Sequence, residues 1–324
     1  MSLRLLTSAM KSHDITATQT NQSTEQKLNV IINNQFCLDY KIVSGGFGDV
    51  YAGHILGSDR EVAVKLQRRD GWKHEDVKAE ADVCRALFGG NGFPELIWCG
   101  QEEGYSILVH ERLGPSLNNL FHYCKKRLSL KTVLMLADQA IARLAYMHRK
   151  GYLHGDIKLD NILMGNGKNA NVAYPIDFGM AKRFDPEGAS KTLTQFLGTP
   201  QYAPFAAHEF RPQSFADDLE SLGYCLVHLA TGSLPWAQEG GRDTAAYVVA
   251  SYAMKKAVSS KSLCRGLPEE FVKYMDHLKR LRYGQMPNYS YLRRLFRNVC
   301  YARGFKHDYV YDWTDRLFEF YQTV

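Results

Sequence analysis

Between residues 36 and 113 the chain alternates short runs of β-branched and aromatic residues with Gly, Asp and Ser. Such runs, bounded by turn-forming residues, are typical of β-strands. In "KHEDVKAEADVCRALF", by contrast, apolar residues recur at a period near 3.6 and predict a helix with one apolar face, made of Val77, Ala81, Cys84 and Leu87/Phe88. We therefore expect a five-stranded sheet with one inserted helix. The expected strands are "CLDYKIVS", "DVYAGHIL", "EVAVKLQ", "ELIWCGQ" and "YSILVHERL".

From residue 114 onward the pattern is helical. "SLNNLFHYCKK" and "SLKTVLMLADQAIARLAYMHRKG" predict two helices, the second with Ser129 as its N-cap and Gly151 as its stop. We expect a loop region over 152–182, then the apolar and buried helix of "ADDLESLGYCLVHLATG", then further helices between 241 and 320. The predicted class is α+β, with a small β-rich part over 35–113 and a larger helical part over 114–324.

Residues 1–34 are mostly polar and are predicted to form a disordered tail. The segment "DITATQTNQSTEQKL" is rich in Thr and Gln and has few large apolar groups. Such a segment buries too little surface to offset the entropy lost on ordering.

Composition and charge bear on the partners and the compartment of the protein, but not on its chemistry. The net charge of +6 is mild and there is no dense basic block, so we expect no direct nucleic acid binding. The seven cysteines form no C-x-x-C pair, which favours a reducing compartment, cytoplasmic or nuclear, over a disulfide framework or a zinc site. No apolar run approaches the roughly 20 residues that span a bilayer. Nothing in the pattern predicts a coiled coil, so a monomer is expected.

A glycine-rich turn and a strand lysine suggest phosphate binding. "SGGFGDV" (44–50) lies between two predicted strands, and "VAVK" ends at Lys65 on the next strand. Backbone N–H groups of such a hairpin can face phosphate oxygens that the lysine also reaches. A buried lysine needs an anionic partner, and Glu80 on the inserted helix is the natural candidate. Taken singly, the turn could be an ordinary tight turn, and Glu80 a surface residue.

"LHGDIKLDNIL" (153–163) supplies the remaining parts of a phosphoryl-transfer site. Asp156 can orient and deprotonate an acceptor hydroxyl, Lys158 can stand near the transferring phosphoryl group, and Asn161 can bind Mg²⁺. Asp177, in "IDFGMAK", can provide a second metal ligand. Each motif alone could belong to an unrelated polar loop. Their joint occurrence in this order is what favours a kinase.

These motifs resemble those of eukaryotic protein kinases, and further stretches resemble the casein kinase 1 family more closely. They are "GFPELIWCG", "LGPSLNNLF", "LSLKTVLMLADQ", "DDLESLGY", "GSLPW" and "PNYSYLRRLFRNVCYARGFKHDYVYDW", which together span most of residues 36–313. The resemblance implies one bilobal kinase domain over 35–313 that uses ATP and Mg²⁺. It also implies phosphoryl transfer to Ser or Thr of protein substrates, and Lys158 agrees with that choice of acceptor.

The resemblance also implies where the nucleotide binds. His110 takes the gatekeeper position, Glu111 to Leu113 form the hinge that holds adenine, and Asp218 holds the backbone of the catalytic loop. "LGTPQYAPF" forms the floor for the substrate peptide. The full set of implied nucleotide contacts is Val43, Ser44, Gly45, Gly46, Phe47, Gly48, Val50, Ala63, Lys65, His110, Glu111, Leu113 and Leu163.

The chain departs from the family pattern at several places. Val43 replaces the first glycine of G-x-G-x-x-G, but Gly45 and Gly48 remain, so ATP binding is expected to survive. Phe215 and Ala216 stand where the family has basic residues that help to bind acidic or phosphorylated substrates. The basic run after "GSLPW" is missing, and the activation segment looks shorter. We therefore expect no preference for phospho-primed sites.

Gly155 stands where many kinases have an arginine that receives a phosphate from the activation segment. Phosphorylation at Thr192, Thr194 or Thr199 would lack that receptor, so activity is expected not to depend on it. An arginine at 155 is accordingly expected to change basal activity little. The "HGDIK" and "LGYC" stretches also resemble the vaccinia-related kinases, a neighbouring branch.

Three alternatives stay open at this stage. Small-molecule phosphotransferases also use H-G-D followed by Asn, but they usually lack Lys158 and the peptide platform. A pseudokinase would bind ATP without turnover, which the intact candidate residues disfavour. Finally, an active kinase could act mainly as a docking partner.

Overall fold

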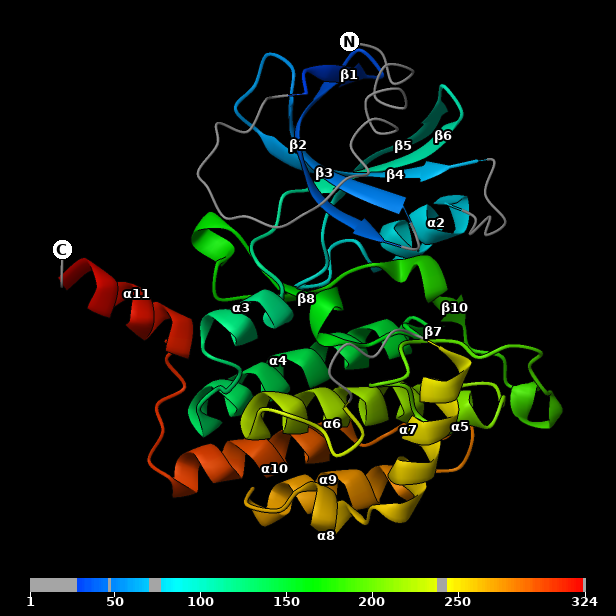
Figure 1. Ribbon diagram of the computed structural model, residues 1–324, viewed down its shortest axis with the longest axis vertical. Helices are drawn as coiled ribbons and strands as arrows, with labels where there is room; N and C mark the ends of the chain where they lie inside the picture. The colour runs from blue at the N-terminus through cyan, green and yellow to red at the C-terminus, as the bar shows by residue number, and fades with distance from the viewer. Residues whose placement is uncertain (1–27, 46–47, 70–76, 238–243, 323–324) are drawn as a thin grey trace. The chain divides into compact units, whose positions relative to one another are not determined.

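The computed structural model describes residues 28–45, 48–69, 77–237 and 244–322, without the side chains of 318–322. The chain divides into two compact units. The first, here called the sheet unit, comprises Met1–Phe88 and Pro94–Leu113. The second, the helical unit, comprises Gly89–Phe93 and Gly114–Val324. The predicted α+β class, with a β-rich part carrying one helix and a larger helical part, is confirmed (Figure 1).

The sheet unit is built on six antiparallel strands in the order β1-β2-β3-β4-β6-β5. Its apolar face buries residues from five of these strands, including Val30, Leu38, Tyr51, Val64 and Val109. The strand bounds are β1 Val30–Ile32, β2 Phe36–Gly45, β3 Gly48–Ile55, β4 Glu61–Arg68, β5 Leu96–Glu102 and β6 Tyr105–Glu111.

The first strand corrects the prediction of a disordered tail up to residue 34 and of a five-stranded sheet. Val30 and Ile32 are fully buried, and β1 pairs with β2 along the register Val30↔Leu38. Asn33 and Asn34 both have left-handed φ values, 49° and 51°, as a tight type I′ hairpin turn requires. The apolar triplet is therefore ordered by the hairpin it forms. Residues 1–27 of the predicted tail lie outside the described part of the chain.

The inserted helix, α2 (Val77–Leu87), follows its predicted amphipathic pattern with one exception. Val77 and Ala81 are buried against Leu108 of the sheet, and Cys84 and Leu87 are buried as well. Phe88, predicted on the same face, is 61% exposed because it lies beyond the last helical residue, Leu87, and so is not part of the buried face of the helix.

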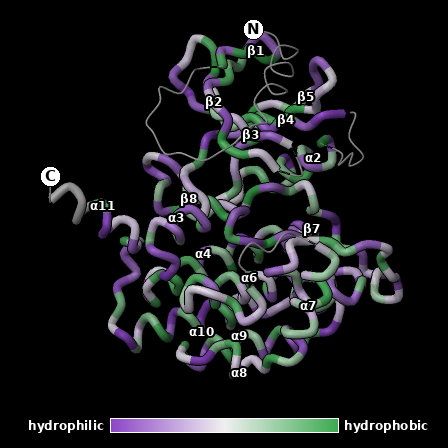
Figure 2. The backbone as a smooth tube through the Cα atoms, viewed as in Figure 1, coloured by the Kyte–Doolittle hydropathy of each residue, from purple (hydrophilic) through white to green (hydrophobic). Residues whose placement is uncertain are grey.

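The helical unit packs its longer helices around α4 and α6. Ser129 caps α4 by accepting a hydrogen bond from the N–H of Thr132, and the helix ends before Gly151, whose φ of +79° cannot continue it. The helix bounds are α3 Leu117–Tyr123, α4 Leu130–Arg149, α5 Phe205–His208, α6 Phe215–Thr231, α7 Ala245–Ala257, α8 Ser260–Leu263, α9 Glu269–Lys279, α10 Tyr289–Ala302 and α11 Asp312–Gln322. Figure 2 shows hydrophobic and hydrophilic residues interleaved along the backbone of both units, as amphipathic elements require.

The stretch predicted as a loop, 152–182, contains paired strands. β7 (Tyr152–Leu153) pairs with β10 (Lys182–Arg183), and β8 (Ile162–Met164) pairs with β9 (Ala173–Pro175). These two short ladders fix the ends of the segments that carry the candidate catalytic residues. Among the described helices, none has the length and hydrophobicity that a membrane crossing requires.

Candidate active site

A buried ion pair joins Lys65 of β4 to Glu80 of α2. The lysine Nζ lies 2.9 Å from Oε2 and 3.2 Å from Oε1 of the glutamate, and the two side chains are 13% and 5% exposed. A charge buried this deeply persists only with a partner. The pairing proposed from the sequence is therefore formed. Val50 lies directly opposite Lys65 in the ladder and Ala63 is two residues away, so all three share one face of the sheet.

The hairpin between β2 and β3 carries the glycine-rich turn. Val43 and Ser44 are exposed, and Gly45 pairs with Gly48 at its tip. Gly48 has φ of +112°, and a Cβ there would lie 2.4 Å from the carbonyl oxygen of Leu66, so only glycine fits. Gly46 and Phe47, which were predicted to complete the phosphate-binding loop, lie outside the described residues.

The predicted hinge follows β6 at the edge of the sheet unit. His110 lies opposite Ala63 in the ladder, and the carboxylate of Glu111 accepts a hydrogen bond of 2.9 Å from the N–H of Glu95. Leu113 is buried at the end of the unit. Their role in adenine binding, like that of the half-buried Leu163 on β8 of the helical unit, rests on the resemblance and stays a prediction.

The candidate catalytic cluster of the helical unit is centred on Asp156, which is 5% exposed. Lys158 Nζ lies 2.6 Å from Asp156 Oδ2 and 3.2 Å from Thr199 Oγ1. Thr199 in turn donates its hydroxyl hydrogen bond to Asp156 Oδ1 at 2.8 Å. Burial opposes the charged form of Lys158, but Asp156 and its other acidic neighbours outweigh this and raise its pKa. The three side chains thus form a closed, charged cluster with the carboxylate held at both oxygens.

Asn161 and Asp177 lie beside this cluster with ligand atoms suited to a hard cation. The amide nitrogen of Asn161 donates to the carbonyl oxygen of Asp156 at 3.0 Å and to its Oδ2 at 3.3 Å. The amide nitrogen of Asn161 is thus engaged by Asp156, and the amide oxygen can bind a metal. The N–H of Ile176 bonds the carbonyl of Asn161 at 2.9 Å, which brings the two predicted metal ligands to neighbouring backbone, and Asp177 is among the carboxylates that raise the pKa of Lys158. Carboxylate and amide oxygens fit a divalent cation of the magnesium type.

The backbone of the catalytic loop is held by Asp218 of α6, as the resemblance implied. Its Oδ2 accepts from the N–H of His154 at 2.8 Å and from His148 Nε2 at 2.9 Å, and its Oδ1 accepts from the N–H of Gly155 at 2.9 Å. Burial alone would raise the pKa of Asp218, but the hydrogen bond and charge of His148 and the donors of the loop lower it. Asp218 is therefore an ionised anchor for His154 and Gly155, the two residues that directly precede Asp156.

The backbone conformation at residue 155 favours glycine. Its φ is +80°, which L-residues adopt at a cost, and a Cβ added there would lie 3.0 Å from the carbonyl oxygen of Met180. An arginine at 155 would strain the loop that carries Asp156. The sequence-based expectation that this change leaves basal activity almost untouched is therefore revised.

A buried lysine missed by the sequence analysis holds the predicted peptide platform. Lys255 of α7 is 2% exposed, and its Nζ lies 2.8 Å from the carbonyl oxygen of Pro200, 2.6 Å from that of Ala203 and 3.0 Å from His208 Nε2. Burial lowers the pKa of Lys255 to about 7, although the charge of Glu220 opposes this. Three acceptors around one ammonium group match its three N–H donors. Lys255 thus fastens the segment that follows Thr199.

The two positions that depart from the family's basic residues lie at the start of α6. Phe215 is buried, with its ring centroid 4.5 Å from that of Phe184 and 5.2 Å from that of His148, and Phe184 continues to Tyr283 at 5.4 Å. Ala216 is half-buried. The position of a family basic residue is thus filled by a ring in an aromatic cluster, which offers no charge to a phosphate.

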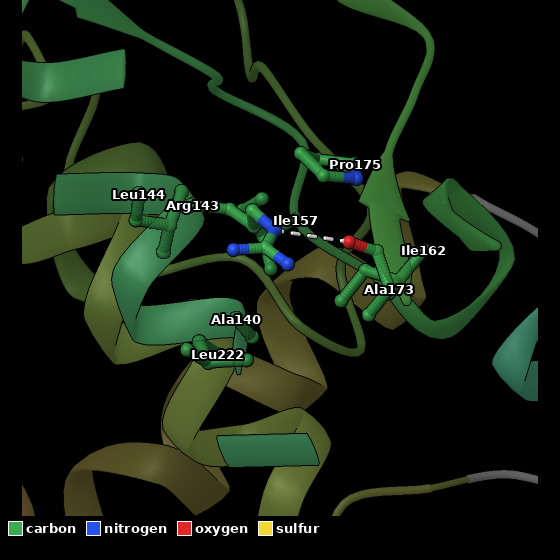
Figure 3. A pocket seen from close by; sticks show the side chains of 8 residues that line it. All are labelled: Ala140, Arg143, Leu144, Ile157, Ile162, Ala173, Pro175 and Leu222. Carbon is green, nitrogen blue, oxygen red and sulfur yellow. Dashed lines mark hydrogen bonds between the residues drawn. The ribbon is translucent and has the colours of Figure 1, made fainter. Parts of the chain in front are cut away.

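A cavity behind the catalytic loop is too small for a substrate. Its volume is about 10 Å³, room for about one water molecule. Arg143 reaches across it and donates from Nε to the carbonyl oxygen of Ala173 at 3.2 Å (Figure 3). The lining residues are Ala140, Arg143, Leu144, Ile157, Ile162, Ala173, Pro175 and Leu222.

Two residues of the helical unit's site escaped the sequence analysis for different reasons. Thr199 was considered as a phosphorylation site and as part of the platform "LGTPQYAPF", but not as a hydrogen-bond partner of Asp156. Lys255 carried no such signal, since "AMKKAV" reads as an ordinary helix with surface lysines.

Comparison with known families agrees with this geometry. A family model described as the protein kinase domain matches residues 36–283, which is more than half of the chain. The match includes Lys65, Glu80, Asp156, Asn161 and Asp177, and it favours protein phosphorylation with ATP and a divalent metal over small-molecule phosphotransfer. The chain belongs to the protein kinase family.

Proposed function

We propose that this protein is a serine/threonine kinase, similar to casein kinase 1, that transfers the γ-phosphoryl group of Mg-ATP to protein substrates. The observation that carries the proposal is the Asp156–Lys158–Thr199 cluster, in which a buried carboxylate is oriented by a lysine at 2.6 Å and a threonine at 2.8 Å. A carboxylate fixed in this way can position and deprotonate an alcohol, and the adjacent cation can offset charge on the moving phosphoryl group.

The remaining residues have matching roles in this proposal. Asn161 and Asp177 would hold Mg²⁺, which neutralises charge on the phosphate oxygens when it is bound. Lys65, fixed by Glu80, would contact the phosphates from the sheet unit. Because transfer needs mainly positioning and electrostatic stabilisation, these side chains suffice without a covalent intermediate.

We further propose that unprimed substrates are accepted as readily as phospho-primed ones. The burial of Phe215 beside Phe184 and the small side chain of Ala216 support this, because neither position can neutralise a phosphate. The chain is proposed to act as a monomer in the cytoplasm or nucleus, without binding nucleic acid directly.

Activity is proposed not to require phosphorylation of the activation segment. Gly155 cannot pair with a phosphate, and the hydroxyl of Thr199 is already donated to Asp156. A phosphate on Thr199 would place a dianion against that carboxylate and break the cluster. Phosphorylation there is expected to inhibit.

Acceptor specificity tests the proposal. The purified chain would be assayed with matched peptides that differ only in a Ser, Thr or Tyr acceptor, each with and without an upstream phosphoserine. The proposal predicts transfer to Ser and Thr, little to Tyr, and similar kcat/KM for primed and unprimed peptides. Preference for Tyr would overturn the acceptor assignment, and a strong preference for primed peptides would overturn the role given to Phe215.

A further inference from the structure

Three metal-ligating side chains converge on one face of the β2–β3 hairpin. Cys37 of β2 lies directly opposite His54 of β3. Asp39 is the extra residue of a β-bulge between Leu38 and Tyr40, and bulges commonly redirect a side chain. The Cys37 sulfur, a carboxylate oxygen of Asp39 and a ring nitrogen of His54 all lie within 4.8 Å of one another.

The spacing of these atoms is close to that of a tetrahedral zinc site. Zinc–oxygen and zinc–nitrogen bonds of about 2.0–2.1 Å place two such ligands about 3.3 Å apart at the tetrahedral angle. Asp39 Oδ2 and His54 Nδ1 are 3.1 Å apart. With a zinc–sulfur bond of about 2.3 Å the sulfur would lie about 3.6 Å from the other ligands. Since it now lies within 4.8 Å of them, Cys37 has to approach by about 1.2 Å at most.

Burial and charge at Asp39 supply a second, independent observation. Asp39 Oδ1 is buried and accepts no hydrogen bond from any group in the described part of the chain. An ordinary Asp–His hydrogen bond explains Oδ2 and Nδ1 but leaves Oδ1 unsatisfied, which costs free energy. Cys37 is only 7% exposed, whereas the His54 side chain is 35% exposed and gives an ion access. A cation that contacted both carboxylate oxygens of Asp39 would also satisfy the buried Oδ1.

We propose that Cys37, Asp39 and His54 form a zinc-binding site. A thiolate, an imidazole and a carboxylate are the ligands that zinc prefers, whereas magnesium prefers oxygen alone. Three protein ligands leave a fourth position for water. The site shares no residue with the proposed magnesium ligands: Cys37 belongs to the sheet unit, whereas Asn161 and Asp177 belong to the helical unit.

Zinc at this position would tie β2 to β3 near the end of the hairpin opposite its glycine-rich tip. β2 has 10 residues, so the site lies on the order of 25 Å along the strand from Gly45. The thiol must lose its proton to bind the metal, so binding should release protons and weaken at acidic pH.

Metal binding to the full chain without nucleotide tests this proposal. The wild type, His54→Gln and Cys37→Ser would be dialysed against zinc, and bound metal would be measured per chain. Cys99→Ser is the matched control, because Cys99 is a half-buried cysteine on β5 of the same unit. We expect about one zinc per wild-type and control chain, with affinity at least about 100-fold weaker in the other two variants.

Cobalt provides a second readout that needs no variant. Co²⁺ bound through Cys37 should produce a thiolate-to-metal absorption band that zinc abolishes by displacement. His54→Gln changes a partly exposed side chain, so its fold is expected to survive, as circular dichroism would verify. Zinc uptake equal in wild type and His54→Gln, or cobalt binding without a thiolate band, would overturn the site.

Discussion

Replacing Asp218 by asparagine tests how strongly the catalytic loop depends on one buried carboxylate. The aspartate accepts three hydrogen bonds, from the N–H groups of His154 and Gly155 and from His148, each at 2.8–2.9 Å. An asparagine side chain has one acceptor oxygen. If that oxygen takes the place of Oδ2, the NH₂ group faces the N–H of Gly155, donor against donor.

The magnitude follows from that one lost bond. Leaving a buried N–H unpaired, with the loss of a charge-assisted bond, costs about 2 kcal/mol. If the loop that carries Asp156 needs this bond to hold its geometry, the same free energy corresponds to a fall in kcat of roughly 30-fold. The midpoint of thermal unfolding should drop by roughly 4–8 °C.

Steady-state kinetics and thermal unfolding of Asp218→Asn would measure both effects. Asp217→Asn is the matched control, because burial, reinforced by the charge of Glu220, raises the pKa of Asp217 to about 8, so its side chain is mostly neutral at pH 7. Its bond to the N–H of Ser214 can be kept by an amide oxygen. The control should change kcat less than about threefold, on the order of 0.5 kcal/mol. If Asp218→Asn kept wild-type kcat, the anchoring role would be refuted.

Three further predictions concern Lys65, Gly155 and Lys255. Lys65→Met leaves its glutamate partner uncompensated and should destabilise the fold by roughly 3–5 kcal/mol in denaturant titrations, with a lower kcat; unchanged kcat would contradict a phosphate contact. Gly155→Arg should cost about 1–2 kcal/mol of stability, measured by chemical unfolding, and a large gain of activity after treatment with an activating kinase would contradict our account. Lys255→Met leaves the carbonyls of Pro200 and Ala203 unpaired and should raise KM for peptide but not for ATP. The pKa of Lys255 is about 7 in the folded protein and about 10.4 in the unfolded chain, so the wild type should gain stability relative to this variant as the pH rises between these values. Equal dependence of unfolding free energy on pH in the two proteins would contradict the assignment.

The elements predicted best were those whose residues repeat one local rule. The period of α2 and the capping of α4 by Ser129 follow from sequence alone. The sequence also predicted Glu80 as the partner of Lys65, because a lysine among apolar strand residues needs an anion. β1 was missed because three apolar residues are a weak signal until the turn at Asn33 and Asn34 pairs them with β2.

Other features depend on contacts between residues far apart in the chain. Whether Lys255 is exposed depends on Pro200 and Ala203, more than fifty residues earlier, and no local pattern encodes that. The positive φ of Gly155 likewise occurs where its N–H donates a hydrogen bond to Asp218, 63 residues later in the chain. Sequence motifs therefore identify the reacting groups, whereas the residues that position them emerge only from tertiary packing.

Transfer of a labelled γ-phosphate by the wild type and by Asp156→Asn, before and after phosphatase treatment, tests the central claim most directly. The account predicts that the phosphatase-treated wild type phosphorylates casein or an acidic Ser/Thr peptide. Asp156→Asn should bind ATP but fall in kcat by on the order of 100-fold or more, because the positioned carboxylate is lost. Equal transfer by both proteins, or nucleotide binding with no transfer by the wild type to any acceptor, would contradict it.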